Sequence, residues 1–315
     1  MGKEHFSKQP SLLRLTLPKV NGGSLNSEES CGGKSAGHFT VCGDTHGQFY
    51  DLLNIFEIGG FPSKENPYLF NGDFVDRGSF SFETVFTLLA IKLACPEGLY
   101  MLRGNHETKN MNKIYGFEGE VRHKYDPCVM SHFAALFKWL PIAAVISNND
   151  TSNPLSIFVV HGGLSTNIPV ADCDSKGIGA VTLEAIESIP RGREPPESGL
   201  MADLLWSDPQ PLCGRAASKR GVGFSFGPDY TAAFLEKNNL QLLVRSHEVK
   251  DEGYVVEHDG KCITIFSAPN YCDQMGNKGA LIQFKEDMKP VFTQFEASPH
   301  PEIPPMWYAR NVFGL

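Results

Sequence analysis

The sequence predicts an α/β fold, and three observations support that prediction. Short runs rich in β-branched and aromatic residues alternate with amphipathic segments in the first half of the chain. Several of these runs are followed directly by polar residues of the types that bind metals. The second half contains mainly strand-like runs. Such alternation is typical of βαβ units around a buried sheet.

The expected elements begin at Phe39. In the first half we expect strands at residues 39–42, 68–70, 99–102 and 157–160, and helices near 48–58, 80–94 and 129–139. In the second half we expect strands at residues 242–244, 254–256 and 262–266. Asp259-Gly260 predicts a hairpin turn between the last two strands.

The remaining regions are expected to be irregular. Residues 1–38 are predicted to be an irregular lead-in, because 21–37 is rich in Gly, Ser, Asn and Glu. Residues 147–156 and 165–190 are predicted to be extended polar surface loops. Residues 299–315 begin with four prolines up to position 305, which predicts an extended segment on the surface.

Composition excludes several classes of protein. Of the 315 residues, 41% are hydrophobic and 20% are charged, so we expect a sizeable core rather than disorder. The net charge of −8 argues against a nucleic-acid binder. No apolar run approaches the ~18 residues of a membrane span, and no signal peptide is visible. The eight cysteines include no C-x-x-C pair, which favours free thiols in a reducing compartment.

Polar residues at five predicted strand ends carry the chemistry. The segments are Gly43-Asp44-Thr45-His46-Gly47, Asn71-Gly72-Asp73-Phe74-Val75-Asp76-Arg77-Gly78, Arg103-Gly104-Asn105-His106-Glu107, His161-Gly162-Gly163 and Arg245-Ser246-His247-Glu248. Each alone is more often an ordinary turn or a hydrogen-bonded polar residue. Five together are hard to ascribe to chance, because ligands of α/β sheets sit beyond the carboxyl ends of the strands.

The types of ligand limit which metals the site could bind. Carboxylate, amide oxygen and imidazole without thiolate suit Mn, Fe or Zn. Six ligands are too many for one catalytic ion that must keep open positions, and they fit two ions about 3.5–4 Å apart with a bridging carboxylate. The six candidates are Asp44, His46, Asp73, Asn105, His161 and His247.

These motifs resemble the signature set of the PPP family of serine/threonine protein phosphatases. His161-Gly162-Gly163-Leu164, Leu205-Trp206-Ser207-Asp208-Pro209, Arg220-Gly221 and Ser267-Ala268-Pro269-Asn270-Tyr271-Cys272 continue the match in the same order, over about residues 39–310. The resemblance implies a calcineurin-like metallophosphoesterase fold, a central β-sandwich flanked by helices, with the catalytic domain at residues 39–298.

The resemblance also implies roles for the metal ligands. Asp44, His46 and Asp73 would hold one ion, and Asn105, His161 and His247 would hold a second that shares Asp73. Mn²⁺ is the expected metal, with Fe or Zn as native alternatives. A hydroxide between the ions would attack the phosphorus of phosphoserine or phosphothreonine in line.

Other residues would bind the substrate or transfer its proton. By the same resemblance, His106 would protonate the leaving serine or threonine oxygen, and Asp76 would orient the His106 ring. Arg77 and Arg220 would hold phosphate oxygens, with further donors from Asn105 and Tyr271.

Residues 115–120 and 272–278 resemble one branch of this family in particular. Members of that branch usually carry an N-terminal tetratricopeptide domain that binds the heat-shock 90 chaperone. This chain shows no 34-residue helical repeat, so that partner is expected only if such a domain lies upstream. Residues 306–313 resemble the branch's short C-terminal helix. We otherwise expect a monomer in the cytoplasm and nucleus that acts on phosphoproteins and binds neither nucleic acid nor membrane.

Three other interpretations of the sequence fit it less well. A cysteine phosphatase needs Arg six residues after its Cys, but Lys219 holds that place after Cys213. A non-catalytic phosphoprotein-binding scaffold would be expected to lack a ligand or His106, and none is missing. A nucleotide or phosphodiester substrate remains an alternative. The loops 147–156 and 165–190 either alter substrate contacts or are inert, and loop tolerance favours the second.

Overall fold

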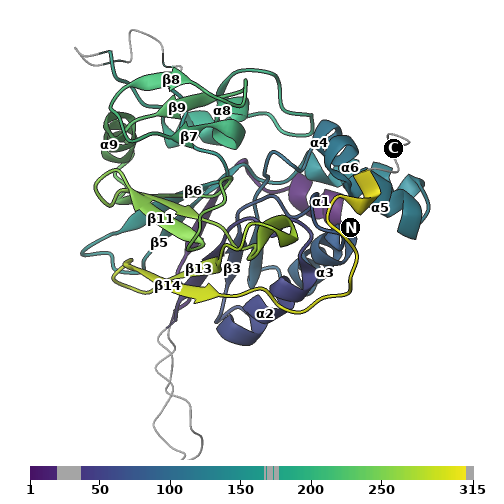
Figure 1. Ribbon diagram of the computed structural model, residues 1–315. Helices are drawn as coiled ribbons and strands as arrows, with labels where there is room; N and C mark the ends of the chain where they lie inside the picture. The colour runs from purple at the N-terminus through teal and green to yellow at the C-terminus, as the bar shows by residue number, and fades with distance from the viewer. Residues whose placement is uncertain (20–36, 167, 169–172, 174–176, 310–315) are drawn as a thin grey trace, which may run out of the picture.

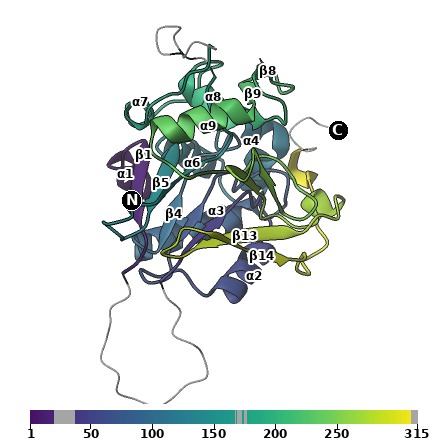
Figure 2. The same ribbon diagram turned by 90° about the vertical axis from the view of Figure 1, so that its left-hand side faces the viewer.

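The computed structural model describes residues 1–19, 37–166, 168, 173 and 177–309. Two β-sheets pack face to face, and helices cover their outer faces (Figure 1). In both Figure 1 and Figure 2, α8 and α9 lie at the opposite end of the molecule from α2. The predicted α/β class and the central sandwich flanked by helices are both confirmed.

The five-stranded sheet has the order β14-β13-β2-β3-β4. Its strands β2, β3 and β4 run parallel, in the register Val41↔Leu69 and Leu69↔Tyr100. β13 lies antiparallel to β2, and β14 lies antiparallel to β13. The strands are β2 (Phe39–Cys42), β3 (Tyr68–Phe70), β4 (Leu99–Met101), β13 (Gly279–Phe284) and β14 (Pro290–Phe295).

The six-stranded sheet has the order β1-β5-β6-β10-β12-β11. β6, β10 and β12 run parallel, and β11 and β12 form the predicted hairpin through Asp259-Gly260. His258, Asp259 and Gly260 have φ values of 51°, 54° and 83° in that turn. The strands are β1 (Leu12–Thr16), β5 (Ala143–Ser147), β6 (Ser156–Val160), β10 (Leu242–Arg245), β11 (Tyr254–Glu257) and β12 (Cys262–Ile265).

The space between the two sheets is filled by aliphatic side chains from alternate strand positions. Val41 of β2 packs into this core with Val244 and Ile263 of the opposite sheet, and all three are at most 1% exposed. The neighbouring Cys42 points to the other side, toward the helices. This period of two is the reason that both faces of β2 are apolar: each buries a separate core.

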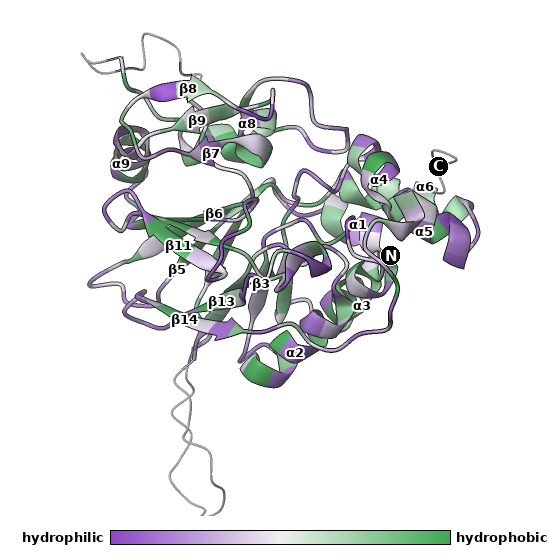
Figure 3. Ribbon diagram, viewed as in Figure 1, coloured by the Kyte–Doolittle hydropathy of each residue, from purple (hydrophilic) through white to green (hydrophobic). Residues whose placement is uncertain are grey.

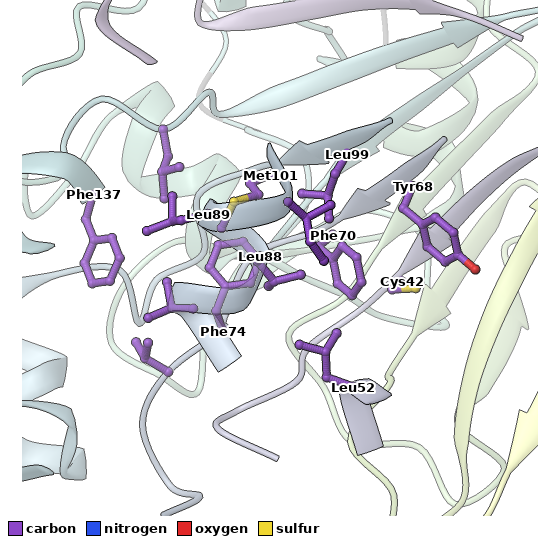
Figure 4. Close-up of a cluster of buried hydrophobic side chains, with 14 of the residues drawn as sticks. Cys42, Leu52, Tyr68, Phe70, Phe74, Leu88, Leu89, Leu99, Met101 and Phe137 are labelled. Carbon is purple, nitrogen blue, oxygen red and sulfur yellow. The ribbon is translucent and has the colours of Figure 1, made fainter. Parts of the chain in front are cut away.

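Helices cover the outer face of each sheet. The five-stranded sheet packs on α2 (Phe49–Gly59), α3 (Ser81–Ala94), α5 (Phe117–Lys124) and α6 (Cys128–Phe137) (Figure 4). The six-stranded sheet packs on α7 (Leu183–Glu187), α8 (Leu200–Trp206) and α9 (Pro228–Lys237). Figure 3 shows both hydrophobic and hydrophilic residues on α2 and α3, as expected of helices with one buried face.

Two shorter units lie beside these layers. α4 (Lys109–Tyr115) leads directly into α5 through Gly116, whose φ is 117°. A small sheet of order β7-β9-β8 lies beside α8 (Figure 1). Its strands are β7 (Asp208–Pro209), β8 (Arg215–Ala217) and β9 (Phe224–Phe226).

The prediction of an irregular lead-in over residues 1–38 is wrong for its first part. Residues Gly2–Ser7 form α1, whose Phe6 is fully buried in the helix-side core. β1 then pairs in parallel with β5 and buries Leu12 and Leu13. The signal that could have revealed β1 is the alternation Leu-Arg-Leu-Thr-Leu over residues 13–17, which is typical of a strand with one buried face. Residues 20–36 lie outside the described residues.

The two extended loops are also shorter than expected. Residues 147 and 156 belong to β5 and β6, so the first loop is the turn between two paired strands. Residues 165–190 include α7, whose Leu183 and Ile186 pack into the core beneath the six-stranded sheet. A single helical turn with two apolar residues is too short to stand out as a periodic pattern.

Two expectations from composition can be checked on the described residues. Their seven cysteines are all free, as expected, and Cys31 lies outside them. No helix in the described ranges has the length and apolar character to span a membrane.

Candidate dinuclear metal centre

Five parallel strands from both sheets end at one place in the molecule. Asp44 comes two residues after β2, Asp73 three after β3, and Asn105 four after β4. His161 and His247 follow β6 and β10 of the other sheet by one and two residues. All six predicted metal ligands, His46 included, are at most 8% exposed. The sandwich thus brings together side chains that are up to 203 residues apart in sequence.

The histidines are held with one ring nitrogen turned toward the centre. His46 donates from Nδ1 to the carbonyl of Val75 at 3.0 Å, and His161 donates to that of Asn71 at 2.8 Å. A ring that donates from Nδ1 keeps the lone pair of Nε2 for a cation. Backbone carbonyls therefore set both rings in the form that a metal requires.

Asp73 occupies the middle of the site. Its Oδ1 accepts the backbone N–H of His106 at 2.9 Å. Its Oδ2 lies 3.6 Å from His46 Nε2 and 3.3 Å from His161 Nε2. Two groups of ligand atoms, each within 4.8 Å, share this residue: His46-Asp73-His106 and Asp73-His161-His247. One carboxylate oxygen thus faces both candidate ion positions.

The residues present fit a pair of cations. Three groups that ordinarily accept hydrogen bonds face one another: His161 Nε2 lies 2.9 Å from Asn105 Oδ1 and 3.2 Å from His247 Nδ1. Asp44 Oδ1 accepts the His247 N–H, but its Oδ2, which lies 3.6 Å from His46 Nε2, is buried without a hydrogen-bond partner among the described residues. Burial raises the pKa of Asp44 to about 7. Nitrogen and oxygen atoms that converge without donors are the surroundings that a divalent cation satisfies.

His106 and Asp76 form a buried pair beside this cluster. His106 Nδ1 donates to Asp76 Oδ2 at 2.8 Å, and Asn112 Nδ2 donates to the same oxygen at 3.0 Å. The N–H of Phe117 bonds to Asp76 Oδ1 at 2.9 Å. Burial lowers the pKa of His106, but the charge of Asp73 and the hydrogen bond to Asp76 outweigh it and raise the pKa overall. The ring is therefore oriented and disposed to carry a proton.

A cleft of about 340 Å³ opens onto the cluster. Arg77, Arg220 and Tyr271 all line it, as do Met111 and Trp206. The Arg77 guanidinium lies 3.9 Å above the Tyr115 ring, and its buried Nε has no partner among the described residues. Arg220 reaches both oxygens of Asp208, at 2.6 and 3.3 Å. The cleft thus presents two guanidinium groups beside the carboxylates of Asp44, Asp73 and Glu248, which also line it.

The loops that form the site hold strained backbone conformations. Five of the predicted site residues have positive φ: His46 at 39°, Asp73 at 50°, Asp76 at 73°, Arg77 at 71° and His247 at 73°. Such conformations cost roughly 1–3 kcal/mol each in non-glycine residues and concentrate at functional sites. Gly104 permits the close packing, because a Cβ there would lie 2.1 Å from Asp73 Oδ1.

The structure adds functional residues that the sequence analysis did not assign. Glu107 is fully buried and accepts the backbone N–H groups of Asp73, Phe74 and Gly104 at 2.8–2.9 Å. Burial raises its pKa to about 7. Glu107 ends the motif of residues 103–107, and its carboxylate in that position was the signal that could have revealed its hydrogen bonds to the backbone around Asp73.

Arg245 has a similar supporting role on the other sheet. It is fully buried and donates to the carbonyl of Gly162 at 2.5 Å, to Glu248 at 2.8 Å and to Asp208 at 2.9 Å. It therefore ties together the loops that carry His161, His247 and Arg220. An arginine at the end of an otherwise apolar strand was the signal that could have revealed it.

Comparison with known proteins identifies the family. Residues 37–251 match the model of the calcineurin-like phosphoesterases. The chain belongs to that family. A serine/threonine-protein phosphatase 5 of Arabidopsis thaliana is 62% identical over 279 residues, 88% of this chain and 48% of the relative. That of Solanum lycopersicum is 61% identical over 314 residues, 99% of this chain and 50% of the relative.

A solved structure agrees with these sequence matches. The Saccharomyces cerevisiae structure described as a protein serine/threonine phosphatase with similarity to human phosphatase PP5 has a TM-score of 0.82 and 40% identity. The alignment covers 98% of this chain and 90% of that one. The predicted family is confirmed, and the branch indicated by residues 115–120 and 272–278 is that of phosphatase 5. The chain spans about half the length of the curated relatives it matches.

Proposed function

We propose that this protein is a metal-dependent serine/threonine protein phosphatase that hydrolyses phosphoserine and phosphothreonine directly, with His106 as the general acid. The observation that carries the proposal is the position of Asp73, one oxygen of which faces both ligand groups while the other accepts the N–H of His106. This arrangement would set a general acid beside a centre for two cations. The relatives named above are serine/threonine-protein phosphatases.

The ligands divide into two sets around Asp73. Asp44, His46 and Asp73 would hold one ion. The other ion would be held by Asn105, His161 and His247, with Asp73 shared. Mn²⁺ is the metal we expect, and Fe and Zn suit the same ligands. Two bound cations would supply Lewis-acid activation of a water for attack on phosphorus and would stabilise the developing negative charge.

The protein's own acid acts on the leaving group. The oxygen of serine or threonine leaves poorly without a proton, and His106 would donate one from Nε2. Asp76 accepts from Nδ1 of that ring at 2.8 Å, and Asn112 and Phe117 hold Asp76 in place. The pair therefore orients the ring and favours its protonated form.

The cleft would bind the phosphate through its cationic and polar lining. Arg77 and Arg220 present guanidinium groups, which match pairs of phosphate oxygens. Asn105 and Tyr271 line the same cleft and would add donors. The ion pair with Asp208 orients the Arg220 guanidinium before the substrate binds.

The proposal is tested on two substrates. After chelation the protein should lose activity on a phosphothreonine peptide, and Mn²⁺ should restore it. A dinucleoside polyphosphate should be hydrolysed far more slowly than the peptide. Full activity in the demetallated protein would refute the metal dependence, whereas a preference for the dinucleotide would favour the nucleotide alternative.

The wider setting follows from the proposed activity. The partners would be phosphoprotein substrates, and the heat-shock 90 chaperone would bind only if a tetratricopeptide domain lies upstream. We propose a monomeric protein of the cytoplasm and nucleus. Co-fractionation with cytosolic and nuclear markers tests the location.

A further inference from the structure

A second cavity lies on the far side of the helix that borders the cleft. This groove, of about 920 Å³, is formed by α4, α5 and the start of α6, which lie together in Figure 1. Lys109, Lys113, Arg122 and His123 line it, and Glu118 is the one carboxylate among its lining residues. We call it the basic groove.

Helix α4 separates the basic groove from the cleft. Lys109 and Lys113 are four residues apart and therefore share one face of the helix, which borders the groove. Met111 and Tyr115 share the opposite face and line the cleft. An α-helix with its side chains is about 10–12 Å across. A chain passing from cleft to groove therefore covers roughly that distance, which is three to five residues when extended.

The charge in the groove is available for binding. Among the described residues, neither Lys109 nor Lys113 forms an ion pair through its side chain, and both are exposed. Glu118 is already paired with Arg122 at 2.6 Å. Glu194, which approaches the backbone of Lys109, pairs with Lys138. In a chain of net charge −8, such a patch selects acidic partners.

We propose that the basic groove is a docking site for an acidic segment of the phosphoprotein substrate, three to five residues from the phosphorylated residue. This inference rests on the proposed function and adds a substrate preference to it. Charge complementarity and adjacency to the cleft carry it. The groove contributes affinity and orientation, while the chemistry stays with the residues of the cleft.

The test compares phosphothreonine peptides that carry either three glutamates or three glutamines, placed three to five residues from the phosphothreonine on one side or the other. At low ionic strength we expect the acidic peptide on one side to have a kcat/KM about 3- to 30-fold above its neutral match, mainly through KM. The advantage should shrink at high salt, because the Debye length falls from about 10 Å at 0.1 M to 3 Å at 1 M.

The double variant Lys109→Glu with Lys113→Glu should abolish that advantage. The control is Lys237→Glu with Lys289→Glu, which changes the net charge equally at two exposed lysines outside the groove and the cleft. Both variants should hydrolyse p-nitrophenyl phosphate at the wild-type rate, which verifies that they fold. An advantage that survives the groove variant, or that the control also loses, overturns the inference.

The failures of the two proposals can be told apart. If the wild-type protein hydrolyses acidic and neutral peptides equally well, the docking inference is wrong and the proposed function stands. If it cleaves p-nitrophenyl phosphate but no phosphopeptide, the proposed function is wrong and the docking inference falls with it.

Discussion

The interior of the sandwich and the loops at its strand ends are equally buried but are stabilised by different means. Between the sheets, Val41, Val244 and Ile263 are aliphatic and lie in regular strands. At the strand ends, Asp44 and Asp73 are no more exposed, yet they are ionisable, and Asp73 has a positive φ. The interior is stable through packing alone, whereas the strand-end loops depend on supporting hydrogen bonds and, we propose, on cations.

The largest expected effect removes the shared ligand. Asp73→Asn should lower kcat by more than the roughly 10²–10⁴-fold that loss of a general acid costs. It should also reduce metal content, because one oxygen of Asp73 faces both ligand groups. Metal analysis and kcat on a phosphothreonine peptide would be measured together. Two retained ions with a wild-type rate would show that the two regions do not differ as we describe.

The next effect concerns the acid. His106→Ala should lower the rate on a phosphothreonine peptide by roughly 10²–10⁴-fold. The loss should be smaller on p-nitrophenyl phosphate, whose leaving group needs no proton. Metal content should stay at the wild-type level, which separates an acid from a ligand, since His106 also lies within one of the ligand groups. Equal losses on both substrates would argue against the acid.

A core substitution should have the opposite profile. Ile263→Ala removes a side chain that is 1% exposed between the sheets, and it should lower the free energy of unfolding by about 2–5 kcal/mol. Denaturant unfolding measures this effect. Activity and metal content of the folded protein should not change. If metal binding weakened in step with stability, the two regions would not be separable.

The smallest expected effect lies in the hydrogen bonds that support the loops. Glu107→Gln replaces an acceptor of three backbone N–H groups around Asp73, and it should weaken metal binding by roughly 10–100-fold. Metal titration measures the change. Glu118→Gln is the matched control, because Glu118 is not within the site and pairs only with Arg122 in the described structure. If both variants bound metal with the same affinity, Glu107 would not support the metal-binding loop.

The sequence predicted most of the parallel strands because they are apolar on both faces. Residues 39–42 and 68–70 match β2 and β3, and the strand-end motifs correctly located the residues that converge. α1 was missed because it is only six residues long and its burial depends on α6, which is distant in sequence. β1 did leave a local pattern, the alternation Leu-Arg-Leu-Thr-Leu over residues 13–17, but it lies in a region that was expected to be irregular.

The candidate site divides in the same way. Side chains with metal-binding chemistry could be found from residue types at the strand ends, and the structure brings all of them together. The groups that orient them could not, because most are backbone atoms. The carbonyls of Val75 and Asn71, which fix two imidazole rings, carry no signature in the sequence.

The pairing of β1 with β5 has a consequence for any shortened form of this protein. Ser11 Oγ also donates to the carbonyl of Ile189 at 2.6 Å, so the N-terminal segment contacts the rest of the domain through this hydrogen bond as well as through β1. Deleting residues 1–17 would remove the partner of β5 along its whole length. β5, with its five apolar and small residues, would then be an unpaired edge strand. An exposed, apolar edge strand can pair with a strand of a neighbouring molecule, which leads to aggregation. In the intact protein the edge strand is β1 instead, and its exposed Arg14 is a residue type that disfavours pairing with another strand.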